Sequence, residues 1–136
     1  MSTSSQYFRN PAAEITYWPA GYVRADWRSM AAEPAELRAI YGHVLRALQR
    51  YAVTAVLFVH HQPEAISEEL QHWVVGEWIP RAMREANYQR CALVELSHPT
   101  EETDAQAISQ RLKGQMEFSF FASIDEAAAW LLRPAG

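Results

Sequence analysis

The stretch LFVHHQPEAISEELQHWVVGEWIP, residues 57–80, decides the fold. It begins inside AVTAVLFV (52–59), a short β-branched run that is typical of a strand covered on both faces. A polar turn follows, and Ser67 then offers a side-chain cap to a helix whose first turn carries Glu68 and Glu69. A buried strand followed by a helix predicts a crossover unit of a mainly parallel sheet.

The same alternation of strand and helix extends to both sides of this stretch. Residues 34–51 form the clearest helix, because Pro34 suits a first turn and the apolar residues follow one stripe. Pro80 is expected to kink or split the helix in which it lies. Further elements are expected as strands at 89–96 and 116–121 and as helices at 67–87, 103–114 and 124–132.

The N-terminal part predicts a β-hairpin. EITYW (14–18) and YVRADWR (22–28) read as two strands around the turn PAG, and Val23, Ala25 and Trp27 alternate with charged residues. We therefore expect one α/β domain over 14–133, with a mixed, mainly parallel sheet of about five strands covered by helices and opening with this hairpin. Residues 1–13 are expected to be a flexible or partly ordered segment.

Composition narrows the functional classes. The chain has 136 residues, 49% of them hydrophobic, which suits one domain with a sizeable core. Its 12 Lys and Arg residues are scattered and its net charge is -4, whereas a nucleic-acid surface needs clustered cations. Cys91, the only cysteine, favours a reducing compartment, and neither a secretory signal nor an apolar run of membrane length is evident. We expect a cytoplasmic protein with no nucleic-acid partner and no membrane span.

Two stretches carry a resemblance to a known family: ISEELQHWVVGEWIPRAMREANYQRCALV (66–94) and FSFFASIDEAAAWLL (118–132). Together with the element order, they resemble the STAS-like (SpoIIAA-like) fold of bacterial anti-sigma-factor antagonists, and more closely small bacterial STAS-like proteins, over roughly 14–133. The resemblance implies a binding or regulatory module more than an enzyme. Relatives often carry Asp where this chain has His60 and His61. Phosphorylated antagonists carry Asp-Ser, whereas Ser67 follows Ile66, so no phosphorylation switch at Ser67 is implied.

Polar residues gather where the central strand and the next strand end. In an open parallel sheet, ligands bind beyond the carboxyl ends of the strands. The candidate ligand-binding residues at this rim are His60, His61, Glu64, Ser67, Ser97 and His98. Imidazole is a frequent metal ligand and titrates near neutral pH. The structural alternative is that the two adjacent histidines point to opposite faces of the strand and serve packing or solvation. We find no spacing typical of a metal site, nucleophile or phosphate loop, which predicts no catalytic residue, no metal and no cofactor.

The helix after the central strand carries two apolar arcs. Leu70, Trp73, Val74 and Trp78 lie on one arc, and a second arc lies nearly opposite. One alternative is that the second arc packs inside the protein, because a kink at Pro80 changes the directions in which the following side chains point. The other is that the second arc contacts a partner. The interface candidates are Trp73, Trp78, Ile79 and Met83.

These observations leave three functional hypotheses. The first is a non-enzymatic, cytoplasmic protein-interaction or regulatory module, either homodimeric or bound to a protein partner. The second is a small-molecule or lipid-binding domain with an apolar cavity between a helix and the sheet. The third is a His-dependent enzyme or metal site at His60 or His61.

Overall fold

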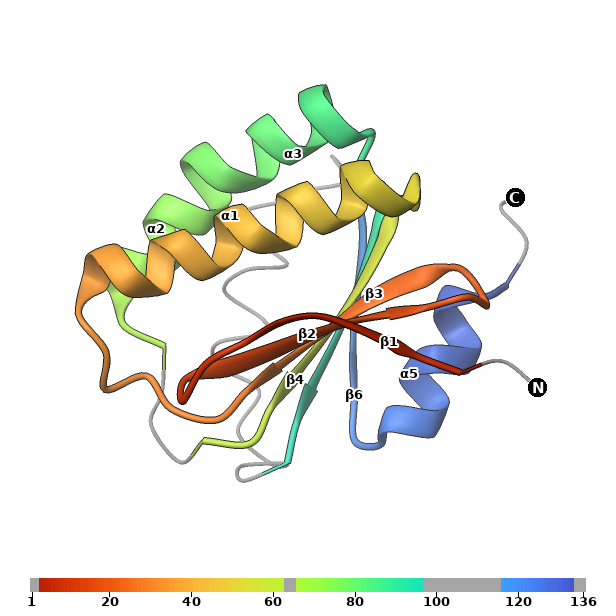
Figure 1. Ribbon diagram of the computed structural model, residues 1–136, viewed down its shortest axis with the longest axis horizontal. Helices are drawn as coiled ribbons and strands as arrows, with labels where there is room; N and C mark the ends of the chain where they lie inside the picture. The colour runs from red at the N-terminus through yellow and green to blue at the C-terminus, as the bar shows by residue number, and fades with distance from the viewer. Residues whose placement is uncertain (1–2, 63–65, 97–115, 134–136) are drawn as a thin grey trace.

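Six strands form one mixed sheet in the computed structural model, which describes residues 3–62, 66–96 and 116–133 (Figure 1). The strands lie side by side in chain order: β1 (Ser5–Arg9), β2 (Ala13–Trp18), β3 (Tyr22–Trp27), β4 (Ala55–His60), β5 (Arg90–Glu95) and β6 (Glu117–Phe121). Pairing is antiparallel from β1 to β3 and parallel from β3 to β6. The α/β class, the mixed sheet and the opening hairpin are confirmed.

The expectation of about five strands is wrong, because β1 adds a sixth. It lies within residues 1–13, so the ordered sheet begins inside the segment expected to be flexible or partly ordered. Buried and exposed side chains do not alternate clearly along its five residues. The pairing with β2 also has an irregularity between Gln6 and Phe8. β1 is held by its backbone pairing with β2 and by aromatic contact with the helix at 34–51, where the ring of Phe8 stacks on His43 at 4.2 Å.

Helices cover both faces of the sheet (Figure 1). One face packs against α1 (Pro34–Tyr51) and the helical segment made of α2 (Glu68–Trp73), η1 (Val74–Trp78) and α3 (Ile79–Ala86). The other face packs against α5 (Ile124–Leu131). All six residues of β4 are buried, as expected for a strand covered on both sides. Fully burying each aliphatic side chain there contributes about 1.5–3 kcal/mol before conformational entropy is counted.

Local sequence explains the ends of α1 and the start of β4. The helix has the predicted bounds and ends at Ala52, which adopts a left-handed conformation with φ of 53°. This cap lets Val53 donate its N–H to the carbonyl oxygen of Leu48 and turns the chain toward the sheet. For this reason β4 begins at Ala55 rather than at residue 52. The helix expected at 103–114 lies outside the described residues.

The helical segment after β4 contains a π-helical turn. Ser67 caps its start, since its Oγ accepts the N–H of Leu70 over 3.1 Å. Within η1 a backbone hydrogen bond spans five residues instead of the four of an α-helix. Ile79 donates its N–H to the carbonyl of Val74, five residues earlier. Pro80, which has no N–H to donate, comes directly after this turn. The helix therefore continues through Pro80 with an irregular turn instead of breaking.

This turn joins the two apolar arcs into one buried face. The wider turn accommodates an additional residue and so changes the phase of the side chains that follow. As a result Trp78 and Ile79, although adjacent, are both buried, at 3% and 4% exposure. No helix among the described residues is long and apolar enough to cross a membrane.

Candidate functional site

A small apolar cavity lies between the helical layer and the sheet. Its volume is about 30 Å³, and we call it the aromatic pocket. It is lined by residues from α1, the α2–η1–α3 segment and three strands, namely Tyr41, Phe58, His60, Ile66, Val74, Trp78, Ile79, Tyr88, Cys91, Leu93 and Phe118. Since a water molecule needs roughly 10–15 Å³ by this kind of measure, the cavity has room for about two water molecules or a group of similar size.

Aromatic rings hold the pocket walls in place. The ring of Trp78 meets Tyr41 and Tyr88 edge-on, with centroid distances of 5.2 and 5.5 Å. Its indole Nε1 also donates to the backbone carbonyl of Tyr41 over 2.8 Å. Each such ring pair adds about 0.5–1.5 kcal/mol beyond the area it buries. The wall formed by η1 is therefore fixed to α1, and a π-helical turn in such a position is a frequent feature of functional sites.

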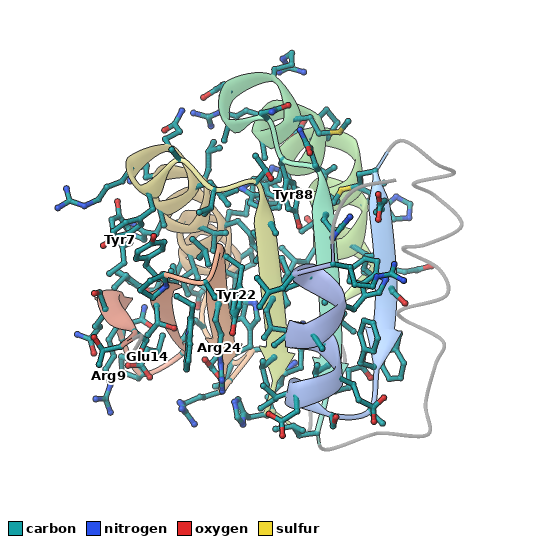
Figure 2. The ribbon with its side chains drawn as sticks, turned by 90° about the vertical axis from the view of Figure 1, so that its right-hand side faces the viewer. Tyr7, Arg9, Glu14, Tyr22, Arg24 and Tyr88 are labelled. Atoms are coloured by element: carbon teal, nitrogen blue, oxygen red, sulfur yellow. The ribbon has the colours of Figure 1, made fainter. Side chains whose placement is uncertain are left out.

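Tyr88, one of the lining residues, has a buried hydroxyl. It precedes β5, close to the end of α3 (Figure 2), and is 2% exposed. The hydroxyl lies beside the Cys91 thiol, a weak acceptor, and finds no nitrogen or oxygen partner among the described residues. Burial, with the nearby Cys91, raises the pKa of Tyr88 well above its usual value. The hydroxyl thus keeps its proton and is a donor without a good acceptor.

Cys91 is not an activated nucleophile. Burial raises the pKa of its thiol to about 12, so the reactive thiolate does not form near neutral pH. The nearby Tyr88 hydroxyl opposes this effect but does not cancel it. Cys91 therefore contributes apolar lining to the pocket.

His60 is a neutral imidazole held in one orientation by Gln62. Burial lowers the pKa of its imidazole to about 4, although the hydrogen bond to Gln62 works in the opposite direction. Gln62 Nε2 lies 2.9 Å from His60 Nδ1. This contact to the Gln62 amide fixes the orientation of the imidazole ring.

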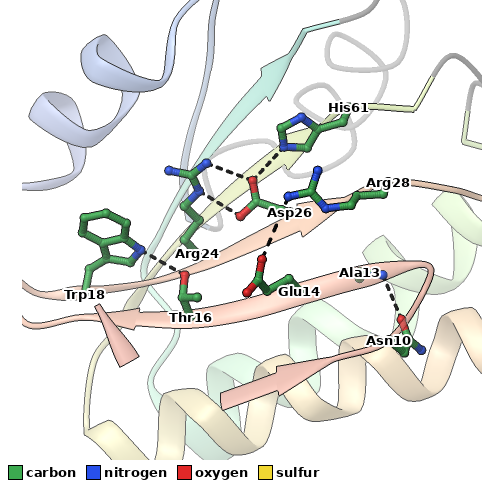
Figure 3. A network of polar contacts seen from close by, with 9 residues as sticks. All are labelled: Asn10, Ala13, Glu14, Thr16, Trp18, Arg24, Asp26, Arg28 and His61. Atoms are coloured by element: carbon green, nitrogen blue, oxygen red, sulfur yellow. Dashed lines mark hydrogen bonds and ion pairs between the residues drawn. The ribbon is translucent and has the colours of Figure 1, made fainter. Parts of the chain in front are cut away.

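His61 points to the other face of the sheet, as the structural alternative for the histidine pair predicts. Its Nε2 lies 2.7 Å from Asp26 Oδ1, and Arg24 binds both carboxylate oxygens of Asp26 at 2.9 Å (Figure 3). Asp26 is only 4% exposed, so its charge needs these partners. Sequence reasoning missed Arg24 and Asp26, which looked like the solvated side of β3. The available signal was an Arg-x-Asp pair on one face of the strand expected next to the histidines.

Of the remaining rim candidates, Ser67 alone falls within the residues that the structure describes. Ser67 caps α2, is exposed and does not line the aromatic pocket. Glu64, Ser97 and His98 lie outside the described residues. In the described ranges no group of three or more His, Cys, Asp or Glu residues is arranged to hold a metal ion.

Two of the four interface candidates are core residues. Trp78 and Ile79 are buried within the described fold, so a partner cannot reach them without opening the helical layer. The sequence pattern assumed a regular α-helix, in which these two adjacent residues point to different sides, whereas the π-helical turn directs both toward the core. Trp73 and Met83 are partly exposed at the edge of the same core, and the Arg38 guanidinium lies 5.5 Å from the Trp73 ring centroid.

Comparisons with protein-family models, with curated proteins and with solved structures return no match.

Proposed function

We propose that this chain is a non-enzymatic, STAS-like regulatory module that works by binding a small apolar molecule, or the apolar end of a larger one, in the aromatic pocket. The observation that carries the proposal is the buried hydroxyl of Tyr88, a residue that lines the apolar cavity, which lacks a good acceptor. Leaving such a group unpaired costs about 1–3 kcal/mol, and a ligand that accepts its hydrogen bond removes that cost.

The position of the pocket supports a binding role. It lies between helices and a mainly parallel sheet, which is where the second sequence-based hypothesis expected a cavity. Residues from position 41 to position 118 meet there, so occupancy would couple α1, η1, β4, β5 and β6. A ligand that orders this contact can change the surface presented to another protein, which is the behaviour of a regulatory module.

The chemistry of the lining favours binding over catalysis. The thiol of Cys91 and the hydroxyl of Tyr88 both keep their protons near neutral pH, and His60 stays uncharged. None of these groups is poised to accept a proton or attack a substrate at that pH. On the opposite face, Asp26 is already engaged by Arg24 and His61.

Equilibrium dialysis against a small-molecule extract of the source cells, read by mass spectrometry, tests this function. Wild type is expected to retain a small apolar compound. Cys91→Met, which adds volume inside the pocket, should lose it, whereas Cys91→Ala, which removes volume at the same position, should keep it. Circular dichroism checks that both variants fold. Equal retention by wild type and Cys91→Met, or no compound above the blank, contradicts the proposal.

A protein partner or self-association remains a second proposal for the same module. The observation that favours it is the partly exposed pair Trp73 and Met83 at the edge of the core. Light scattering after size-exclusion chromatography would show a dimer for wild type and a monomer for Trp73→Asp. A monomer for both proteins contradicts the self-association form of this proposal.

A further inference from the structure

One of the residues that line the aromatic pocket carries a buried hydrogen-bond donor without a good acceptor. Tyr88 has a buried hydroxyl with no nitrogen or oxygen partner among the described residues. His60, the other lining residue with a polar ring, already has its Nδ1 engaged by Gln62. A ligand that satisfies this lining must bring a hydrogen-bond acceptor.

Within residues 3–62, 66–96 and 116–133, the lining also contains no residue that could neutralise a charge. Its described members are aromatic, aliphatic, thiol or imidazole side chains, with no Lys, Arg, Asp or Glu among them. Burial keeps His60 uncharged near neutral pH. Transferring an unpaired carboxylate, phosphate or ammonium into such surroundings costs far more than one hydrogen bond returns.

From these two observations we infer that the aromatic pocket selects the neutral, hydrogen-bond-accepting end of a ligand, such as a ketone, aldehyde, ester or ether oxygen, and rejects carboxylates, phosphates and ammonium groups. This inference rests on the proposed binding function and names the ligand class. The volume of about 30 Å³ restricts the buried part to a few heavy atoms. A longer molecule would extend out of the pocket.

Four probes of similar chain length separate charge from hydrogen bonding: butan-2-one, n-butane, butanoate and butylammonium. Each is titrated into the isotope-labelled full chain, and NMR follows the indole N–H of Trp78 and the methyl groups of Leu93, both of which belong to pocket residues. Butan-2-one is expected to bind at least about fivefold more tightly than n-butane, which corresponds to one net hydrogen bond. Butanoate and butylammonium are expected to cause no shift at the same concentrations.

Tyr88→Phe supplies the matched variant, because it removes the hydroxyl and keeps the ring. It should bind butan-2-one and n-butane equally while its thermal midpoint stays at or above that of wild type, since the lost hydroxyl had no good acceptor.

Binding of butanoate or butylammonium as tight as that of butan-2-one overturns the inference. Equal binding of n-butane and butan-2-one by wild type overturns it as well but leaves the proposed function standing. If none of the four probes shifts the pocket resonances, both the inference and the binding function are overturned.

Discussion

Trp78 donates its indole hydrogen to the backbone carbonyl of Tyr41 over 2.8 Å, and this bond joins the π-helical turn to α1. The two residues are 37 positions apart, and their rings also meet at 5.2 Å. The pocket wall therefore depends on a specific tertiary contact as well as on helix propensity.

Trp78→Phe is expected to destabilise the fold by about 2–4 kcal/mol, because it loses both buried ring area and the bond to Tyr41. Urea denaturation measures the change. Trp18→Phe is the matched control, since Trp18 is half-buried and its Nε1 bonds only to the Thr16 hydroxyl, at 3.0 Å. The control should lose about 1 kcal/mol or less. Equal losses in the two variants would contradict the structural role assigned to Trp78.

His60 should make stability fall as the pH is lowered from about 6.5 toward 4. The pKa of the folded-state imidazole is about 4, against an ordinary value near 6.5. The unfolded chain therefore takes up the proton first, and stability that is present above pH 6.5 is lost as the pH falls. At pH 5 the loss from this one group is about 2 kcal/mol. Urea denaturation at pH 7.5 and pH 5 should show this excess loss in wild type relative to His60→Gln. The same pH dependence in both proteins would refute it.

Asp26 should be far more sensitive to substitution than the neighbouring Glu14. Asp26→Asn leaves Arg24 without its bidentate partner in a largely buried setting, which is expected to cost about 2–4 kcal/mol. Glu14 pairs with Arg28 at 3.9 Å near solvent, so Glu14→Gln should cost about 0.5 kcal/mol or less. Thermal or urea unfolding compares the two variants. A similar small effect in both would show that the Arg24–Asp26–His61 contacts are weak.

Gly21 holds the turn between β2 and β3 at φ of 134°, a conformation that L side chains rarely adopt. Gly21→Ala is therefore expected to destabilise the protein by about 1 kcal/mol or more. Gly42→Ala provides the opposite control, because Gly42 lies inside α1 with open space around its missing side chain. That change should stabilise by about 0.5–1 kcal/mol. If both changes act in the same direction, the turn geometry assigned to Gly21 is wrong.

Elements with a strong repeating pattern could be predicted from the sequence. The apolar stripe over 34–51 predicted the helix α1, and the continuous apolar run predicted the buried strand β4. Both could be recognised because local periodicity and burial set each pattern. The strand β1 could not be recognised, since it depends on backbone pairing with β2 and on ring contacts with α1.

The site was less predictable than the fold. Sequence spacing identified His60 and His61 at a strand end but could not tell which face each histidine serves. Tyr88 has no local pattern that marks its hydroxyl as unpartnered. The aromatic pocket exists only because the π-helical turn turns Trp78 inward against Tyr41, and that choice is made by tertiary packing.

The most direct test of the account is an NMR measurement of intermolecular contacts between bound butan-2-one and the labelled full chain. We predict nuclear Overhauser effects from the ketone's methyl protons to the ring protons of Trp78 and Tyr88, with both reduced in Cys91→Met. Contacts confined to side chains outside the aromatic pocket, or no contacts under conditions in which the pocket side chains are fully assigned, would contradict the claim that this cavity is a ligand site.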